Sequence, residues 1–177
     1  MTPRTVHQME KKNTPSALRL VGGQLIDARR AALSTQGPGP HRMEPVATVK
    51  DILFINDSKA TFLDATLESL GQMEGKVVWI VGDVSSEMDE GYVQDLLREK
   101  VSAMVLFGRP VDSTEEALPS PVEHLYVTDE LRTAVFLANE LVRPGESVLF
   151  SPACPSGNGF ANYEERGAEF KRAVRDL

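Results

Sequence analysis

From residue 41 onward, short apolar runs alternate with segments of helical periodicity, and this alternation constrains the fold more than any other feature of the chain. The runs rich in β-branched residues predict strands at 46–49, 52–55, 77–81, 103–107, 124–127 and 147–150. The amphipathic segments predict helices at 61–70, 91–100, 129–142 and 163–176. Thr61 with Asp64, and Ser113 with Glu116, have the spacing of a capping box. The pattern predicts a Rossmann-like α/β domain, with a mostly parallel sheet and helices on both faces.

The first two predicted strands are separated only by Lys50 and Asp51. A parallel pair needs a crossover of a dozen or more residues, so these two strands could instead pair as an antiparallel hairpin.

The segment before residue 41 has a different pattern. Residues 16–33 carry apolar side chains at helical spacing, although Gly22 and Gly23 weaken that helix. The stretch 37–40, Gly-Pro-Gly-Pro, ends any helix and predicts a linker. We therefore expect two parts, a helical N-terminal extension with its linker at residues 1–40 and the α/β domain at 41–177. The apolar face of residues 14–36 needs a cover, which could be the α/β domain itself, a second copy of the chain or another protein. Of these we expect a protein partner or self-association.

Composition narrows the class of protein. The 177 residues are 41% hydrophobic and 25% charged, which is typical of a globular domain with its own core. A net charge of −7 disfavours nucleic acid and anionic membranes as partners, and no apolar segment is long enough to span a bilayer. The single cysteine, Cys154, excludes an internal disulfide and fits a cytoplasmic protein. The three histidines, His7, His41 and His124, lack metal-ligand spacing, so we expect no metal.

Polar residues follow the second predicted strand and precede a predicted helix. Asp57, Ser58, Lys59 and Thr61 stand between the two elements. Open α/β sheets bind ligands at this edge, and the amino end of a helix favours anions. Lys59 would present a point charge to a carboxylate or phosphate, and Thr61 a hydroxyl. The alternative is ordinary capping, in which Asp57 or Ser58 caps the helix and Lys59 is solvated.

A second polar loop follows the last predicted strand at residues 151–160 and should lie on the same sheet edge. It contains Ser156 and a Gly-Asn-Gly sequence, but the third glycine of a dinucleotide fingerprint is absent, which disfavours an oxidoreductase. Cys154 has no histidine paired with it in sequence, so a nucleophilic role is poorly supported. His41 and Arg42 follow the linker. They are either a solvated hinge pair, or Arg42 faces phosphate across a domain cleft. No G-x-x-x-x-G-K-[ST] phosphate loop occurs.

Together these segments resemble the C-terminal domain of the Mur ligases, especially the D-glutamate-adding enzymes of peptidoglycan synthesis. The blocks that carry the resemblance are 41–44, 54–61, the turn at Gly82, and 151–154 continuing to 162–167. The match covers about residue 41 to the end, and the extension resembles the last helix of the family's central domain.

The resemblance implies a role for each matching residue. Arg42 would face the ATP phosphates, and Asp57 would contact the ribose. Lys59 and Thr61 would lie at the incoming amino acid, and Ser156 and Tyr163 would help to hold the carboxylate of D-glutamate. Family chemistry activates a carboxylate as an acyl phosphate, which an amine attacks, so the protein mainly positions groups and stabilises charge.

The chain also departs from the family pattern. The 177 residues leave no room for the family's N-terminal and central domains, which we therefore expect to be absent from this chain. The lysine expected after the glycine turn falls on Ser85 or Ser86. Phe62 stands in place of the asparagine that follows the threonine, and Asn158 in place of an acidic residue. With Asp83 and Glu87 nearby, an acidic amino acid would meet like charges.

The sequence therefore leaves two hypotheses about function. One is the amino-acid-binding part of an ATP-dependent D-glutamate ligase, either truncated or working beside a separately encoded ATPase domain, with no catalytic residue of its own and inactive in isolation. It would meet ATP and Mg²⁺ only when a separately encoded ATPase domain is supplied. The other is a non-catalytic binding or scaffold module derived from that domain.

Overall fold

The computed structural model describes residues 38–84, 91–109, 122–157 and 159–177. Its strands are β1 (Glu44–Val49), β2 (Ile52–Asn56), β3 (Val77–Val81), β4 (Val101–Phe107), β5 (Leu125–Thr128) and β6 (Ser147–Phe150). Its helices are α2 (Leu63–Gln72), α3 (Gly91–Lys100), α4 (Leu131–Leu141) and α5 (Tyr163–Arg175). The predicted N-terminal helix and the Ser113 capping box lie outside the described residues.

The described strands form one six-stranded sheet in the order β1-β2-β6-β3-β4-β5. Every neighbouring pair is parallel except β1 with β2, which is antiparallel. The hairpin alternative for the first two strands is therefore correct. Lys50 and Asp51 both have positive φ, 49° and 67°, as the two-residue turns that match strand twist require.

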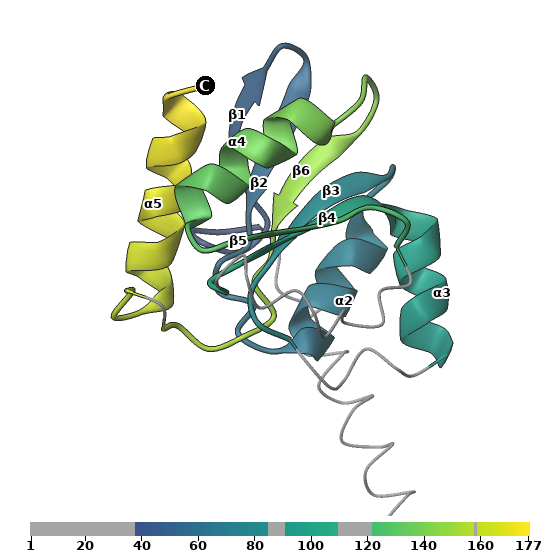
Figure 1. Ribbon diagram of the computed structural model, residues 1–177, viewed down its shortest axis with the longest axis horizontal. Helices are drawn as coiled ribbons and strands as arrows, with labels where there is room; N and C mark the ends of the chain where they lie inside the picture. Colours follow the sequence, from purple (N-terminus) through teal and green to yellow (C-terminus); the bar gives the residue numbers. More distant parts are fainter. Residues whose placement is uncertain (1–37, 85–90, 110–121, 158) are drawn as a thin grey trace, which may run out of the picture.

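Helices cover both faces of the sheet, as predicted (Figure 1). One apolar cluster joins α2 and α3 to one face, and a second joins α4 and α5 to the other. The alternation within β3 shows the division, because Trp79 belongs to the first cluster while Val78 and Ile80 belong to the second. All five β3 residues are buried, as expected for a central strand enclosed on both sides.

The predicted helix at 61–70 is displaced by two residues. It begins at Leu63, and its N-cap is Phe62, which makes no side-chain capping hydrogen bond. The Thr61–Asp64 capping box is therefore wrong, because the chain remains extended through Phe62 (φ −155°, ψ 157°). By contrast α5 has a side-chain cap, in which Asn162 Oδ1 accepts a hydrogen bond from Glu165 N at 2.8 Å.

Candidate functional site

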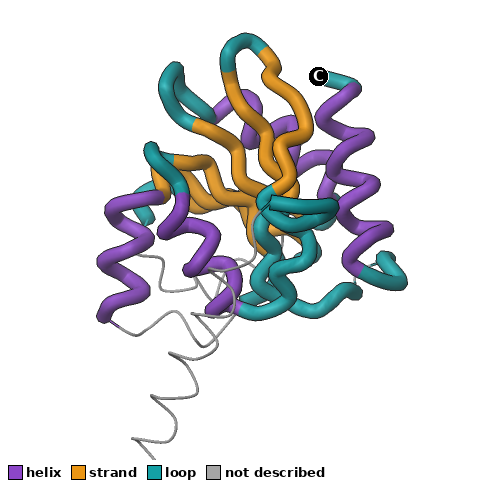
Figure 2. The backbone as a smooth tube through the Cα atoms, turned by 180° about the vertical axis from the view of Figure 1, so that it is seen from behind, coloured by secondary structure: helices purple, strands orange, loops and turns teal. Residues whose placement is uncertain are grey.

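The candidate site lies where the carboxyl ends of the parallel strands meet the loops that lead into α2 and α5. In Figure 2 these loops gather beside the ends of the strands. Backbone hydrogen bonds join the two loops to each other and to the strands: Asp57 N donates to Phe150 O at 2.7 Å, and Ala153 N to Ala60 O at 3.0 Å. The edge predicted from sequence is thus formed from segments almost a hundred residues apart in the chain.

Asp57 is the buried centre of this edge, with 2% of its surface exposed. Its Oδ1 accepts a hydrogen bond from Met43 N at 3.1 Å, and its Oδ2 accepts one from Ser151 Oγ at 2.7 Å. Thr66 Oγ1 lies 2.7 Å from Ser151 Oγ and donates to it, since the serine proton points to Asp57. Asp57 therefore ties β2, β6 and α2 together and does not cap a helix, so the capping alternative is wrong for this residue.

Burial raises the pKa of Asp57, because the charged carboxylate loses its hydration. Hydrogen bonds from Ser151, Ser69 and Met43 and the positive charge of Arg42 act in the opposite direction but do not cancel the effect. Asp57 thus carries a desolvation cost that its neighbours only partly offset.

Three of the predicted site residues meet at one small pocket of about 190 Å³. Its lining comprises Arg42, Asp57, Lys59, Ala60, Phe62, Ala65 and Ser69. Arg42 and Lys59 bring two positive charges to it, and Phe62 adds an aromatic side chain to its lining, at the position where the resemblance implies an asparagine. Ligand pockets usually span roughly 300–1,000 Å³, so these residues can contact part of a nucleotide but cannot enclose one.

Lys59 and Tyr163 are neighbours, although more than a hundred residues separate them. Lys59 Nζ lies 6.0 Å from the centroid of the Tyr163 ring, within cation–π range. Lys59 is exposed, so its ammonium group is available to an anion. Tyr163 is the first residue of α5, and its ring also meets His41 edge-on at 6.0 Å. A hydrogen bond to Glu164 is the main reason why the pKa of Tyr163 is raised.

Arg166 holds the two loops together and was not assigned a role from sequence. It is 1% exposed, and its Nη2 donates to Ser58 O and Cys154 O, both at 3.1 Å. Its Nη1 donates to Pro155 O at 3.1 Å. Ser156 follows Pro155 directly, so this arginine fixes the loop of Lys59 against the loop of Ser156. The available signal was its position three residues after Tyr163, on the same face of α5.

Two glycines permit close approaches in this site. A Cβ built on Gly167 would overlap His41 Nδ1 and Ser58 Oγ, so α5 can approach the 41–58 region only without a side chain there. A Cβ on Gly82 would overlap Cys154 Sγ, so the loop after β6 can approach this position closely only because residue 82 is a glycine. The loops of the site are therefore packed closely enough that one added carbon displaces them.

His41 is part of a hydrogen-bonded network under Gly167 and is not a solvated hinge. Its Nδ1 lies 3.1 Å from Ser58 Oγ and 3.2 Å from Asn56 Nδ2. Burial, and then the positive charge of Lys171, lowers the pKa of His41, which favours the neutral ring. Burial alone would raise the pKa of Glu44, but hydrogen bonds from His41 N, Lys171 and Asn56 outweigh it and lower that pKa.

The structure brings some predicted residues together and leaves others apart from the pocket. Arg42, Asp57 and Lys59 share it, Tyr163 reaches Lys59, and Ser156 lies in the loop that Arg166 fixes. Thr61 is half-buried in the loop before α2 and does not line the pocket. Ser85, Ser86, Glu87 and Asn158 lie outside the described residues.

Within the described ranges, no group of three or more His, Cys, Asp or Glu side chains is arranged to hold a metal ion. None of the helices in these ranges is long and apolar enough to cross a bilayer.

Comparison with known proteins identifies the family. The model of the Mur ligase glutamate ligase domain matches residues 41–154. The UDP-N-acetylmuramoylalanine–D-glutamate ligase of Christiangramia forsetii is 41% identical over 84% of this chain and 33% of that protein. The enzyme of the same name from Caldanaerobacter subterraneus subsp. tengcongensis is 37% identical over 97% of this chain and 39% of that protein.

Among solved structures, the MurF ligase of Thermotoga maritima in complex with ADP is 16% identical, with a TM-score of 0.47, over 90% of this chain and 38% of that one. The chain spans a third to two fifths of the length of the two ligases above. The family match covers more than half of the 177 residues. This chain therefore belongs to the Mur ligase glutamate ligase domain family.

Proposed function

We propose that this domain is the amino-acid-binding part of an ATP-dependent D-glutamate ligase of peptidoglycan synthesis, inactive without a central ATPase domain. The observation that carries the proposal is the meeting of exposed Lys59 with Tyr163, on loops that Arg166 ties together at the ligand-binding edge of the sheet. An ammonium beside an aromatic ring can hold a carboxylate while the ring packs against the aliphatic part of the substrate. The relatives at 41% and 37% identity are named for addition of D-glutamate.

In this proposal the roles are divided between the two loops. Lys59 and Thr61 face the amino acid from the β2–α2 loop, and Ser156 and Tyr163 face it from the β6–α5 side. Arg42 approaches the phosphates and Asp57 the ribose of ATP supplied by another domain. The small pocket of Arg42 and Asp57 suits such a partial contact. ATP and Mg²⁺ would then be held mainly by that other domain, because this chain has no phosphate loop. A ligase that consumes ATP, and that acts before the cell-wall precursor is exported, would work in the cytoplasm.

The test is complementation in trans. The N-terminal and central region of the Christiangramia forsetii ligase, which this chain does not match, is mixed with the full 177-residue chain, ATP, Mg²⁺, UDP-N-acetylmuramoyl-L-alanine and D-glutamate. We expect amide product and ADP from the mixture and from neither part alone. Lys59→Gln should abolish most of the gain, while Lys76→Gln, at the opposite edge of the sheet, should retain it. Turnover by this chain alone, or none with any matched central region, would reject the proposal.

One observation favours the alternative of a non-catalytic binding module. Both oxygens of Asp57 are occupied inside the protein, and the carboxylate is almost fully buried, as suits a structural residue. The alternative predicts no D-glutamate binding up to millimolar concentration in an NMR titration, and no complementation. It also predicts that removal of residues 1–40 disrupts a complex or a dimer, which light scattering would detect.

A further inference from the structure

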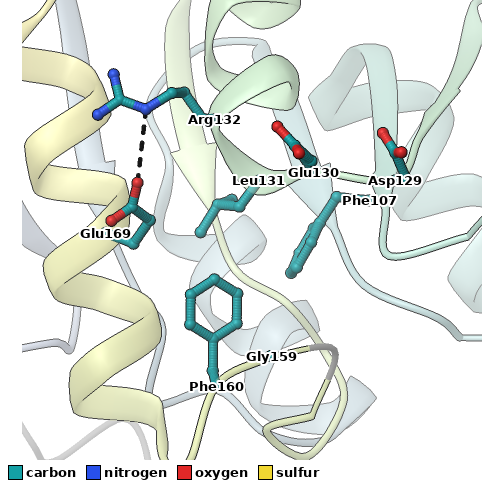
Figure 3. A pocket seen from close by; sticks show the side chains of 8 residues that line it. All are labelled: Phe107, Asp129, Glu130, Leu131, Arg132, Gly159, Phe160 and Glu169. Carbon is teal, nitrogen blue, oxygen red and sulfur yellow. Dashed lines mark ion pairs between the residues drawn. The ribbon is translucent and has the colours of Figure 1, made fainter.

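A second pocket opens at the carboxyl ends of β4 and β5, beside the amino end of α4. It shares no lining residue with the pocket of about 190 Å³ that Arg42, Asp57 and Lys59 line, which is called the Lys59 pocket below. Its volume is about 330 Å³, within the usual range of roughly 300–1,000 Å³ for small-molecule sites. Its lining comprises Phe107, Asp129, Glu130, Leu131, Arg132, Gly159, Phe160 and Glu169. Figure 3 shows Leu131, Phe160 and Phe107 around the centre, with the Arg132–Glu169 ion pair on one side and Asp129 and Glu130 on the other.

The apolar residues that line this pocket pack against buried residues of the domain core. Phe107 and Leu131 are 2% and 3% exposed, and Phe160 is half-buried. The Phe107 ring lies 5.8 Å from that of Phe150, which stacks on Phe170 at 4.8 Å. The rings that face the pocket therefore belong to the second apolar cluster and offer a firm surface to an apolar ligand.

The charge at the mouth of the pocket is negative. Asp129 and Glu130 are both exposed, and neither forms an ion pair among the described residues. Arg132 does not neutralise them, because its Nε lies 3.6 Å from Glu169 Oε1 and its Nη1 donates to Asp176 Oδ2 at 2.6 Å. The amino end of α4 contributes only about half a positive charge, against two full negative charges. A cation is therefore attracted and an anion repelled.

We propose that this pocket binds a small amine, with an apolar or aromatic body against Phe107, Leu131 and Phe160 and its ammonium group toward Asp129 and Glu130. The apolar body of the ligand would be buried against the apolar lining of the pocket. The two carboxylates favour a positively charged group over a negative one at its mouth. This site is separate from the one proposed for the ligase role, since the two pockets have no lining residue in common.

The experiment is an NMR titration of the full ¹⁵N-labelled chain with three probes that share a phenyl ring. These are phenethylamine, the neutral 2-phenylethanol and the anionic 3-phenylpropionate. We expect saturable shifts of the Leu131, Gly159 and Phe160 amides with phenethylamine, weaker binding of the alcohol and the weakest binding of the carboxylate. Glu130→Gln should weaken phenethylamine about two- to fivefold, the range of one exposed ion pair, and leave the alcohol unchanged.

Glu140→Gln is the matched control, because it removes the same charge from the exposed far end of the same helix. It should leave phenethylamine affinity unchanged, and both variants should keep the wild-type spectrum elsewhere. Three outcomes would overturn the proposal: no saturable shift at this pocket, equal affinity for the amine and the carboxylate, or an equal loss in Glu130→Gln and Glu140→Gln. Shifts confined to the Lys59 pocket would also count against it.

Discussion

The two edges of the sheet are built differently. At the carboxyl edge, buried polar groups join the loops: Asp57 with Ser151, and Arg166 with three carbonyl oxygens. At the amino edge, a pocket of about 350 Å³ carries Lys76, Arg98 and Arg143, all exposed. There Arg98 forms its ion pair within its own helix, with Asp95 at 2.9 Å, and joins no loop to another.

The difference has a physical meaning. Burying a carboxylate and a guanidinium costs free energy, which hydrogen bonds offset only when the geometry is held in place. That cost is found at the edge where a ligand would need fixed side chains, and not at the other. If this comparison is correct, substitutions should be severe at the carboxyl edge in proportion to burial and nearly silent at the amino edge. Trp79, the single tryptophan, is fully buried in the central strand β3, so its fluorescence reports global unfolding.

The largest effect is expected for Arg166→Ala. The substitution leaves three buried carbonyl oxygens without a donor and opens a void, so the free energy of unfolding should fall by about 3 kcal/mol or more. Urea unfolding followed by Trp79 fluorescence measures it. Arg172→Ala, on the same helix but exposed and paired with Glu169 alone among the described residues, should cost less than about 0.5 kcal/mol. Equal losses in the two variants would remove the special role of Arg166.

Smaller effects on the free energy of unfolding, opposite in sign, are expected when alanine replaces each of two helical glycines. Gly167→Ala should destabilise by about 1–3 kcal/mol, because the new Cβ overlaps His41 and Ser58. Gly71→Ala, on α2 with nothing near its Cβ position, should stabilise by about 0.5–1 kcal/mol through helix propensity. Thermal unfolding compares the two. If Gly167→Ala is also stabilising, the close approach of α5 to the site loops is wrong.

The pH dependence of stability should have opposite signs at two carboxyl groups of this edge. The pKa of Asp57 is raised in the folded state, so protonated Asp57 contributes to the free energy of unfolding. That contribution is fully present below the ordinary pKa of 3.8 and is lost as the pH rises through the folded-state pKa. The pKa of Glu44 is lowered from 4.5, so its contribution is present above 4.5 and is lost as the pH falls through the folded-state pKa. The wild type should therefore lose stability relative to Asp57→Asn, and gain it relative to Glu44→Gln, as the pH rises.

Urea unfolding of the three proteins between pH 3 and 7 checks these signs, because the other titrations cancel in the differences. If the free energy of unfolding of the wild type instead rises relative to that of Asp57→Asn as the pH rises, the fold stabilises Asp57 as a carboxylate. That result would be contrary to the effect of its burial.

The sheet could be predicted from sequence because periodicity and β-branched runs encode it locally. β3 and β6 were placed at their observed bounds, and the errors elsewhere came at ends such as Thr61, where side-chain spacing suggested a cap that the extended backbone prevents. The edge that carries the polar residues was also predictable, because all carboxyl ends of parallel strands meet there. Arg166, Gly167 and His41 could not be assigned their roles, since each acts through contacts between segments distant in the chain.

The smallest effect is expected at the two exposed lysines of opposite edges, and it tests what the site is for. Lys59→Gln should cost about 0.5 kcal/mol, the lower end for an exposed cation–π contact, because the 6.0 Å separation is at the limit of its range. Lys76→Gln should cost about nothing. Urea unfolding gives both values. A group that faces a ligand can be lost without harm to the fold, whereas a group that holds the fold cannot. A cost above about 1 kcal/mol for Lys59→Gln would place that ammonium with Arg166 in the structural network, and the amino-acid site would then have to rest on Ser156 and Tyr163. A small cost, together with loss of complementation in trans, would separate the ligand-binding groups of the carboxyl edge from the buried groups that hold them in position.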